Sequence, residues 1–444
     1  MKFRAGVCVL VVAAGVCPAM AEDGYVTTVL VASDASYNPQ IVDPNMIDAW
    51  GIALRPPGAG GHIWVDNTRS GTSVEYIGDV MQNGVYMPIH QDGLKSVTVD
   101  APAFTDKGYA SVTGLAYNAA SDLAGQAVEF PVAGPAVDNS TMPPTPIAGG
   151  TSGAAKFVFV TKDGTINAWR SNTAVSMTSA PIVIDYSKTG TLPAGDFANP
   201  VYTGVAITTK PVPAANQGNP AAGNHLFVAD FRNNVVNVFD NQWHDVTGSH
   251  PFVTPATVED LHPFNVQDIG GHLYVAYSRF DPNSDEGFED IPGFGRLVEY
   301  NEDGTLVRDF NSGPVSADEG GHLNSPWGVA IAPATFGKFG GDVLVANFGD
   351  GTIAAFDPAT GDFLDYLRDA NGEVLAIDGL WGLTFGNGFS LGDANSLYFT
   401  AGPDLEQAGM FGRVTVAVPE PASLSVLVAG GMMLLARRRV LRSA

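Results

Sequence analysis

Cysteine is almost absent from this sequence. Its 444 residues include two cysteines, Cys8 and Cys17, and both lie among the first 21 residues. If that stretch is removed on export, the remaining chain has no disulfide, no thiolate nucleophile and no cysteine ligand for a metal. The fold must then be held by burial of its core, for which about 400 residues are ample.

Basic residues are scarce as well. Lys and Arg number 22 against 46 Asp and Glu, which gives a formal net charge of -24. Six of the basic residues lie in the two end segments, so the part between them is more acidic still, at about -30. Such a surface repels nucleic-acid phosphates and anionic lipid headgroups, which excludes nucleic acid as a partner. It suits a soluble exported protein, and it also suits one that holds divalent cations.

Catalytic signatures are missing too. The chain has no Gly-x-Ser-x-Gly, P-loop or Gly-x-Gly-x-x-Gly motif in a strand-turn-helix context, and no His-x-His or His-Glu-x-x-His spacing. Long charged helical patterns are absent, whereas Gly, Pro, Val, Phe and Thr are abundant. This composition predicts an all-β chain. The lack of a catalytic motif favours a binding protein and leaves an enzyme as the alternative.

The N-terminus predicts export. Lys2 and Arg4 precede an uncharged apolar run over residues 5–16, and Ala19 and Ala21 place small side chains where a signal peptidase reads. We therefore expect a signal peptide cleaved after Ala21. The run is too short for a membrane-spanning helix. The alternative is a buried N-terminal strand or helix.

The C-terminus carries a second sorting signal. Its elements are, in order, Pro419, Glu420 and Pro421, an apolar stretch at about residues 422–436, and Arg437, Arg438 and Arg439. The arginines should stay in the cytoplasm, with the stretch before them as a short transmembrane helix. This order resembles the PEP-CTERM tail of Gram-negative, exopolysaccharide-producing bacteria. The resemblance implies processing by an exosortase and release to the cell surface or extracellular matrix; a plain membrane anchor is the alternative.

One unit recurs six times between the two ends. Each unit opens with a short apolar strand near a glycine, continues with a second strand, and reaches a third strand through a tight turn. The second strands are His62–Asn67, Lys156–Thr161, His225–Asp230, His272–Tyr277, Val343–Asn347 and Ser396–Ala401. Turns such as Asp163-Gly164 and Asp350-Gly351 tolerate the positive φ that a tight hairpin needs. Short antiparallel strands repeated in this way predict the blades of a propeller.

The sixth unit lacks an outer strand, because its third strand, Arg413–Val416, runs directly into the tail. Tyr25–Ser33 alternates like a strand, and we expect it to supply the missing one; the alternative is a disordered leader. The prediction is thus a six-bladed β-propeller closed by an N-terminal strand, followed by a C-terminal apolar helix.

The stretch around Trp327, HLNSPWGVAIAP followed by GGDVLVANFGDGTIAAFDPATG, is similar to NHL-type propeller repeats. Residues 25–416 also resemble uncharacterised propeller proteins that carry PEP-CTERM tails. The resemblance implies a fold and a location without an activity. NHL-like propellers include lactonases, amidating lyases and binding modules, so the fold alone does not choose among them.

Seven residues form the predicted ligand face. Five of them occupy the end of the second strand in successive units, and two histidines precede first strands on the same side: Asn67, Thr161, Asp230, Tyr277 and Asn347, with His262 and His322. If these side chains turn inward, they ring the channel mouth, where histidine and carboxylate can bind a metal or act as acid and base. The alternative is that they make ordinary turn and capping hydrogen bonds. No residue is assigned a catalytic role.

Two further patterns point to ligands. Calcium is the one candidate cofactor, because a loop of the fourth unit places oxygen ligands at Asp281, Asn283, Asp285, Glu289 and Asp290. This loop departs from the EF-hand pattern, and an acidic solvated loop is the alternative. The repeated Trp50, Trp327 and Trp381 can stack on sugars, although their recurrence favours packing between blades.

The sequence therefore predicts three parts: a signal peptide at residues 1–21, a propeller at 22–416 and a sorting tail at 417–444. The favoured function is a binding or structural module at the cell surface or in the exopolysaccharide matrix. Its expected partners are signal peptidase and exosortase during processing, and a polysaccharide or surface partner afterwards. The alternative is a metal-dependent lactonase-like or lyase-like enzyme.

Overall fold

The structure is a computed structural model that describes residues 24–56, 60–103, 105, 107–122, 128–172, 174–187, 200–208, 223–258, 261–281, 291–314 and 321–417. The predicted signal peptide, the Pro-Glu-Pro motif, the apolar tail with its arginines, and residues 282–290 of the proposed calcium loop lie outside these ranges. The helical segments within them are 3-10 turns of three or four residues. Over the described part of the chain, no helix is long and apolar enough to cross a membrane. The all-β prediction is confirmed.

Each repeated unit forms one sheet, and the units are numbered here in chain order. The strands of units one to three are β3 (Ala49–Ala53), β4 (Ile63–Asn67), β5 (Thr72–Tyr76) and β8 (Ser96–Val99); β9 (Val112–Tyr117), β14 (Phe157–Thr161), β15 (Thr165–Trp169) and β18 (Ile182–Asp185); and β19 (Tyr202–Ile207), β20 (Leu226–Asp230) and β21 (Val235–Phe239). Those of units four to six are β22 (His262–Ile269), β23 (His272–Ser278), β24 (Gly295–Tyr300) and β25 (Leu306–Asp309); β26 (Pro326–Ile331), β27 (Val343–Asn347), β28 (Ile353–Phe356) and β29 (Phe363–Tyr366); and β30 (Leu380–Phe385), β31 (Leu397–Ala401) and β32 (Met410–Val416).

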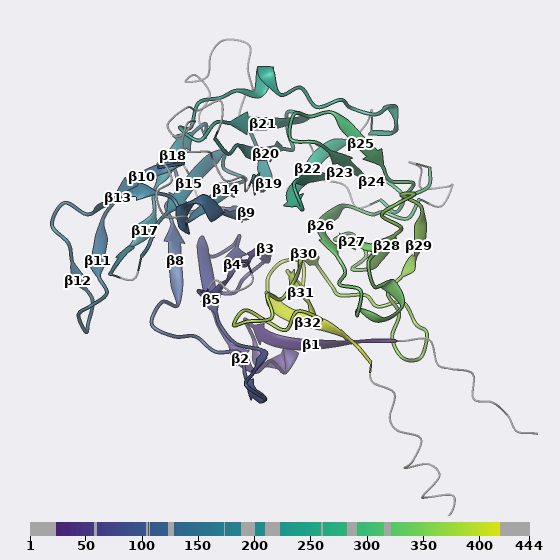
Figure 1. Ribbon diagram of the computed structural model, residues 1–444, viewed down its shortest axis with the longest axis horizontal. Helices are drawn as coiled ribbons and strands as arrows, with labels where there is room; N and C mark the ends of the chain where they lie inside the picture. The colour runs from purple at the N-terminus through teal and green to yellow at the C-terminus, as the bar shows by residue number, and fades with distance from the viewer. Residues whose placement is uncertain are drawn as a thin grey trace, which may run out of the picture.

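The first strands of the sheets lie innermost and follow one another around a common axis (Figure 1). Each of β3, β9, β19, β22 and β26 contacts the first strand of the next unit, and β30 contacts β3, so the ring is closed. The first strands run antiparallel to the second strands. The start of each first strand and the end of each second strand therefore share one face of the ring.

The N-terminal strand β1 (Tyr25–Ala32) closes the last sheet, as the sequence predicts. It pairs antiparallel with β32 from Tyr25↔Val416 to Ala32↔Met410, and β2 (Ile41–Val42) adds a short parallel edge. Tyr25 is buried, and its hydroxyl donates to the backbone oxygen of Phe336 at 3.1 Å. The first and last segments of the body are thus held in one sheet.

A repeated glycine explains how closely the first strands approach. Added to Gly114, a Cβ would lie 3.1 Å from Cα of Gly204 in the next unit. Added to Gly328, it would lie 2.5 Å from the backbone oxygen of Trp381. Unit four carries the larger Asn265 at this position instead.

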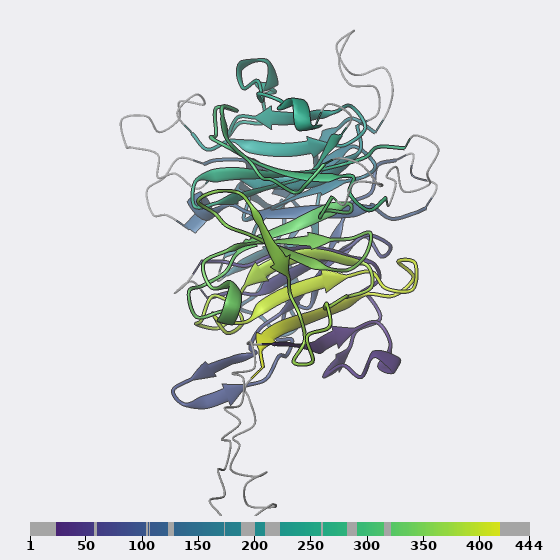
Figure 2. The same cartoon turned by 90° about the vertical axis from the view of Figure 1, so that its right-hand side faces the viewer.

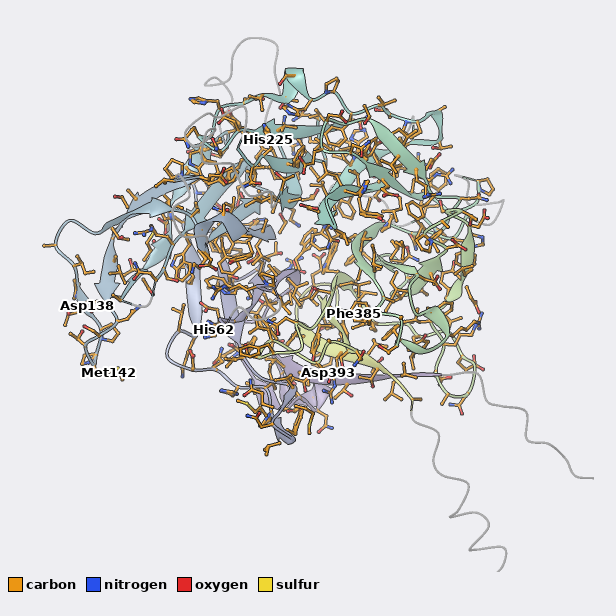
Figure 3. All side chains as sticks on the ribbon, viewed as in Figure 1. His62, Asp138, Met142, His225, Phe385 and Asp393 are labelled. Carbon is orange, nitrogen blue, oxygen red and sulfur yellow. The ribbon has the colours of Figure 1, made fainter. Side chains whose placement is uncertain are left out.

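Two insertions leave the ring. In unit two, β10 (Pro131–Gly134) pairs with β13 (Thr151–Ala154), and β11 (Ala136–Asp138) pairs with β12 (Thr145–Pro146) and β16 (Val175–Met177). This arm projects from the body and carries Met142, 92% exposed, near its tip (Figure 3). In unit one, β6 (Val80–Gln82) and β7 (Val85–Met87) form a separate hairpin, seen at the lower left of Figure 2.

Candidate functional site: the two ends of the channel

Aromatic side chains fill the axis at the end where the first strands begin. Trp50, Phe231, Phe264, Trp327 and Trp381 form one buried cluster. The rings of Trp50 and Trp381 stack with centroids 3.7 Å apart, and Trp327 Nε1 donates across the axis to a backbone oxygen of unit three at 2.8 Å. The repeated tryptophans therefore pack against one another, which agrees with the packing interpretation of their recurrence.

The five predicted strand-end residues lie at the same end of the ring, and four of them turn their side chains into hairpins. All five are at most 3% exposed (Asn67, Thr161, Asp230, Tyr277 and Asn347). Asn347 Nδ2 donates to Thr352 Oγ1 at 2.9 Å, and Asp230 accepts from Asn233 Nδ2 at 2.7 Å. Asn67 and Thr161 bond the equivalent hairpins, while the Tyr277 hydroxyl meets that of Tyr300 at 2.9 Å. For Asn67, Thr161, Asp230 and Asn347 these contacts are the turn and capping bonds that were the alternative to a ligand ring, whereas Tyr277 bonds a side chain of the neighbouring strand β24.

In three of the units, the side chain that reaches the axis belongs to the residue directly after the predicted position. Lys162 Nζ lies 4.8 Å from the ring centroid of Trp50. Phe231 packs at 4.6 Å on Phe264, and Phe348 stacks at 3.8 Å on Trp381. Because successive side chains of a strand point to opposite faces, a shift of one residue exchanges capping and axial roles. Aromatic or basic residues directly after the second strand were the sequence signal for this.

The two predicted histidines have separate surroundings. His262 Nδ1 lies 2.6 Å from the backbone oxygen of Phe231, and its ring lies parallel to Phe280. His322 stacks on Phe363 with centroids 3.7 Å apart. Burial lowers the pKa of both histidines, which favours their neutral forms.

No metal centre emerges from the residues that the structure describes. They contain no group of three His, Cys, Asp or Glu side chains able to hold a metal ion. Of the five proposed calcium ligands, Asp281 alone belongs to the described residues. The calcium loop therefore stays a prediction.

The opposite end of the axis opens into a cavity of about 610 Å³. It lies where the first strands of units one to four end, on the face opposite to the predicted ligand face. Its lining residues are Ala53, Leu54, Pro56, Leu115, Ala116, Tyr117, Ala119, Val205, Ala206, Ile207, Gln267, Asp268, Gly270, Gly271 and Glu302. Units one to three supply mostly apolar walls, and unit four supplies the amide and carboxylate groups.

Tyr117 is held at the rim of this cavity by Asp122. The carboxylate of Asp122 accepts from the Tyr117 hydroxyl and the Arg55 guanidinium, and from Lys156 Nζ at 2.8 Å. Burial, reinforced by the bond to Asp122, raises the pKa of Tyr117 to about 12. Burial opposes ionisation of Asp122, but its bonds to Lys156 and Tyr117 outweigh this and lower its pKa. Tyr117 therefore stays protonated, and its hydroxyl donates a hydrogen bond to the ionised Asp122.

The repeat builds the cavity in a regular way. The fourth residue of the repeated motif is Ala53, Ala116 and Ala206 in units one to three, and these small side chains leave the space open. Unit four places Gln267 at the same position. No motif predicted this site, and the departure of Gln267 from the repeat is the sequence signal that marks it.

No family model matches the chain. Three uncharacterised proteins of Acanthamoeba polyphaga mimivirus are similar in sequence. One is 29% identical over 376 residues, which is 84% of this chain and 76% of that protein. The other two are 34% identical over 197 residues (44% of this chain, 49% of that protein) and 30% identical over 240 residues (53% and 39%). The chain thus spans about half or less of the length of these two relatives.

Several solved structures have a similar course of the chain. An α-L-arabinofuranosidase of Fusarium graminearum matches with a TM-score of 0.44 at 10% identity, over 88% of this chain and 98% of that one. A glucose dehydrogenase matches at 0.41 and 10% (88% and 99%), and a virginiamycin B lyase from Staphylococcus aureus at 0.35 and 11% (89% and 100%). At these scores the likenesses carry no conclusion about what this chain does.

Proposed function

We propose that this protein is an exported, six-bladed β-propeller that acts as a binding module and takes its ligand in the cavity at the end of the first strands. The observation that carries the proposal is the contrast between the two ends of the axis. One end is packed with aromatic rings, whereas the other holds about 610 Å³ of space. Ligand sites of small molecules have volumes of about 300–1,000 Å³ and combine apolar walls with a few polar groups.

The proposal is tested by filling the cavity. The purified body, residues 22–416, is screened by titration calorimetry against neutral mono- and disaccharides and against an acidic polysaccharide. Ala53→Trp should abolish binding of any ligand that the wild type takes, because the indole occupies the space. Ala359→Trp places the same side chain on an exposed turn outside the cavity and should bind normally. Equal binding by both variants would place the ligand elsewhere.

A second candidate is a hydrolase or lyase that uses the same cavity, as in the metal-dependent alternative stated above. Two carboxyl groups line it, Asp268 and Glu302, and paired carboxyl groups can serve as general acid and base. Two results would favour the enzyme. The first is a metal ion held by residues 22–416 that a chelator removes, and the second is turnover that is lost in Asp268→Asn and Glu302→Gln.

The cellular role rests on the two end segments. Cleavage after Ala21 and removal of the tail near Pro419-Glu420-Pro421 would release the module to the cell surface or matrix. N-terminal sequencing and intact mass of the secreted protein test both cleavages. A protein retained in the inner membrane with its tail intact would favour the plain anchor instead.

A further inference from the structure

Unit four interrupts the repeat with two polar residues. Where the other units carry Gly, it carries Asn265, and where four of them carry Ala, it carries Gln267. The two residues lie on the same strand, β22, two positions apart, so their side chains point the same way. A polar pair at positions that are elsewhere small needs a physical reason.

The hydrogen bonds of this pair fix the orientation of the Gln267 amide. The backbone N–H of Val329 donates to Gln267 Oε1 at 2.6 Å, and Asn265 Nδ2 donates to the same oxygen at 3.2 Å. A backbone N–H can only donate, so the amide atom facing Val329 must be the oxygen. Asn265 is itself 1% exposed and held by Nδ2 donation to the Trp327 backbone oxygen at 2.9 Å. The Nε2 group of Gln267 is thereby left to the cavity that this residue lines.

Few of the side chains that line the cavity can donate a hydrogen bond to a ligand. Two of the lining side chains can donate a hydrogen bond, Tyr117 and Gln267. The Tyr117 hydroxyl already donates its hydrogen bond to Asp122, so the amide of Gln267 is the side-chain donor that the lining offers to a ligand. The carboxylates of Asp268 and Glu302 are acceptors in the same lining.

We infer that Gln267 is a specificity-determining residue of the cavity and that the ligand is a neutral polyhydroxylated molecule, a sugar residue, and this inference rests on the proposed function. A bare metal or ammonium ion offers no acceptor for the amide of Gln267, and an anion is repelled by the two carboxylates. A hydroxyl group accepts from Nε2 and donates to a carboxylate at once. The C–H face of a pyranose or furanose packs on the apolar wall formed by Leu54, Leu115 and Ile207.

The decisive variant is Gln267→Glu. It keeps an oxygen for the Val329 N–H and has the same shape, but it presents an acceptor where Gln267 presents a donor. Binding of the neutral disaccharides that the wild type takes, measured by calorimetry with maltose, cellobiose and a pentose disaccharide as probes, should weaken by about tenfold or more. The melting temperature should change little. Gln407→Glu, exposed on the opposite face, adds the same charge and should leave binding unchanged.

A ligand series provides a second measurement that needs no variant. Deoxy sugars lack the acceptor oxygen and should lose affinity at one hydroxyl position, whereas the O-methyl sugar at that position keeps an acceptor for Nε2. In Gln267→Glu the loss of affinity caused by removing that hydroxyl should disappear.

The variants separate the two proposals. Suppose that sugars bind the wild type, that Ala53→Trp abolishes this binding, and that Gln267→Glu binds as well as the wild type. The role of Gln267 is then wrong, and the cavity remains the binding site. If no sugar binds but another ligand is blocked by Ala53→Trp, the sugar assignment alone fails. Binding insensitive to Ala53→Trp overturns the proposed function itself.

Discussion

The imidazole of His62 lies against a carboxyl group that has no contact with solvent: His62 Nδ1 is 3.1 Å from Glu75 Oε2. The same relationship returns in unit four, where His272 Nδ1 is 3.4 Å from Glu299 Oε1. The pairing registers Trp64↔Glu75 and Tyr274↔Glu299 are equivalent, which explains why histidine recurs at the start of these second strands. The recurring histidine therefore has a structural role: it packs against a glutamate whose ionisable carboxyl group is buried between the sheets.

Stability should depend on the protonation of Glu75. Burial, assisted by the nearby Asp92, raises the pKa of Glu75 to about 9. An unfolded glutamate releases its proton near about pH 4.3, so the native state binds the extra proton between these values and stability falls as pH rises through them. We expect Glu75→Gln to melt higher than wild type at pH 8 and close to wild type at pH 4.5. Calorimetric melts at both pH values check this, with exposed Glu373→Gln as control; a variant less stable at pH 8 would contradict it.

Asp230 should behave as a cap and not as a ligand residue. Burial raises the pKa of Asp230 to about 6, and the hydrogen bonds from Asn233 partly offset this because they favour the charged form. We expect Asp230→Ala to reduce the free energy of unfolding by about 1–3 kcal/mol, because the hairpin donors lose their acceptor. Ligand binding in the cavity should be unchanged. Lost binding at an unchanged melting temperature would restore the predicted ligand face.

The closing sheet should depend on one ion pair whose carboxylate is buried. Asp79, buried in unit one, accepts from Arg413 Nη1 on β32 at 2.5 Å and from the Tyr398 hydroxyl at 2.6 Å. We expect Arg413→Met to cost about 3–5 kcal/mol, since it leaves the buried carboxylate without its cation. Hydrogen exchange should then speed up along β1. Arg368→Met breaks a more exposed pair with Asp365 and should cost less than about 1 kcal/mol.

The approach of the first strands should not tolerate a side chain. In Gly328→Ala the new Cβ would meet backbone at 2.5 Å, and we expect a loss of roughly 2–4 kcal/mol in urea unfolding. Gly248→Ala is the control, because nothing lies within 4 Å of its Cβ position. Similar losses of stability in the two variants would mean that the first strands pack less closely than these distances indicate.

The loop that begins at Asp281 is the predicted calcium site, and calcium binding there should stabilise the protein. If the loop binds calcium, millimolar calcium should raise the melting temperature relative to EDTA, with a stabilisation of about 1.4 kcal/mol at ten times the dissociation constant. The double variant Asp281→Ala, Asp285→Ala should lose that response. Equal responses of both proteins, or none, would leave a solvated acidic loop.

Local sequence patterns were sufficient for the repeated strands, their tight turns and the closing strand, and not for the two insertions. Alternation and apolar content identified the second strands, and glycine after Asp163 and Asp350 marked the turns, because both depend on the backbone preferences of neighbouring residues. The clean alternation of Tyr25–Ser33, together with an outer strand missing from the last unit, was enough to pair the two ends of the body. These features require no knowledge of what lies across the axis.

The tertiary structure decided which way the side chains face at the axis and which end of it is open. Every first strand shifts its register against the second strand near its start, as between Ala49 and Ile52 or between Leu380 and Leu383. Such a bulge adds a residue to one strand and reverses the faces beyond it. The bulge thus sets which first-strand side chains, such as Gln267, face the cavity. Whether Asp230 or Phe231 reaches the axis from the second strand depends on packing among units far apart in the chain, which no local pattern records.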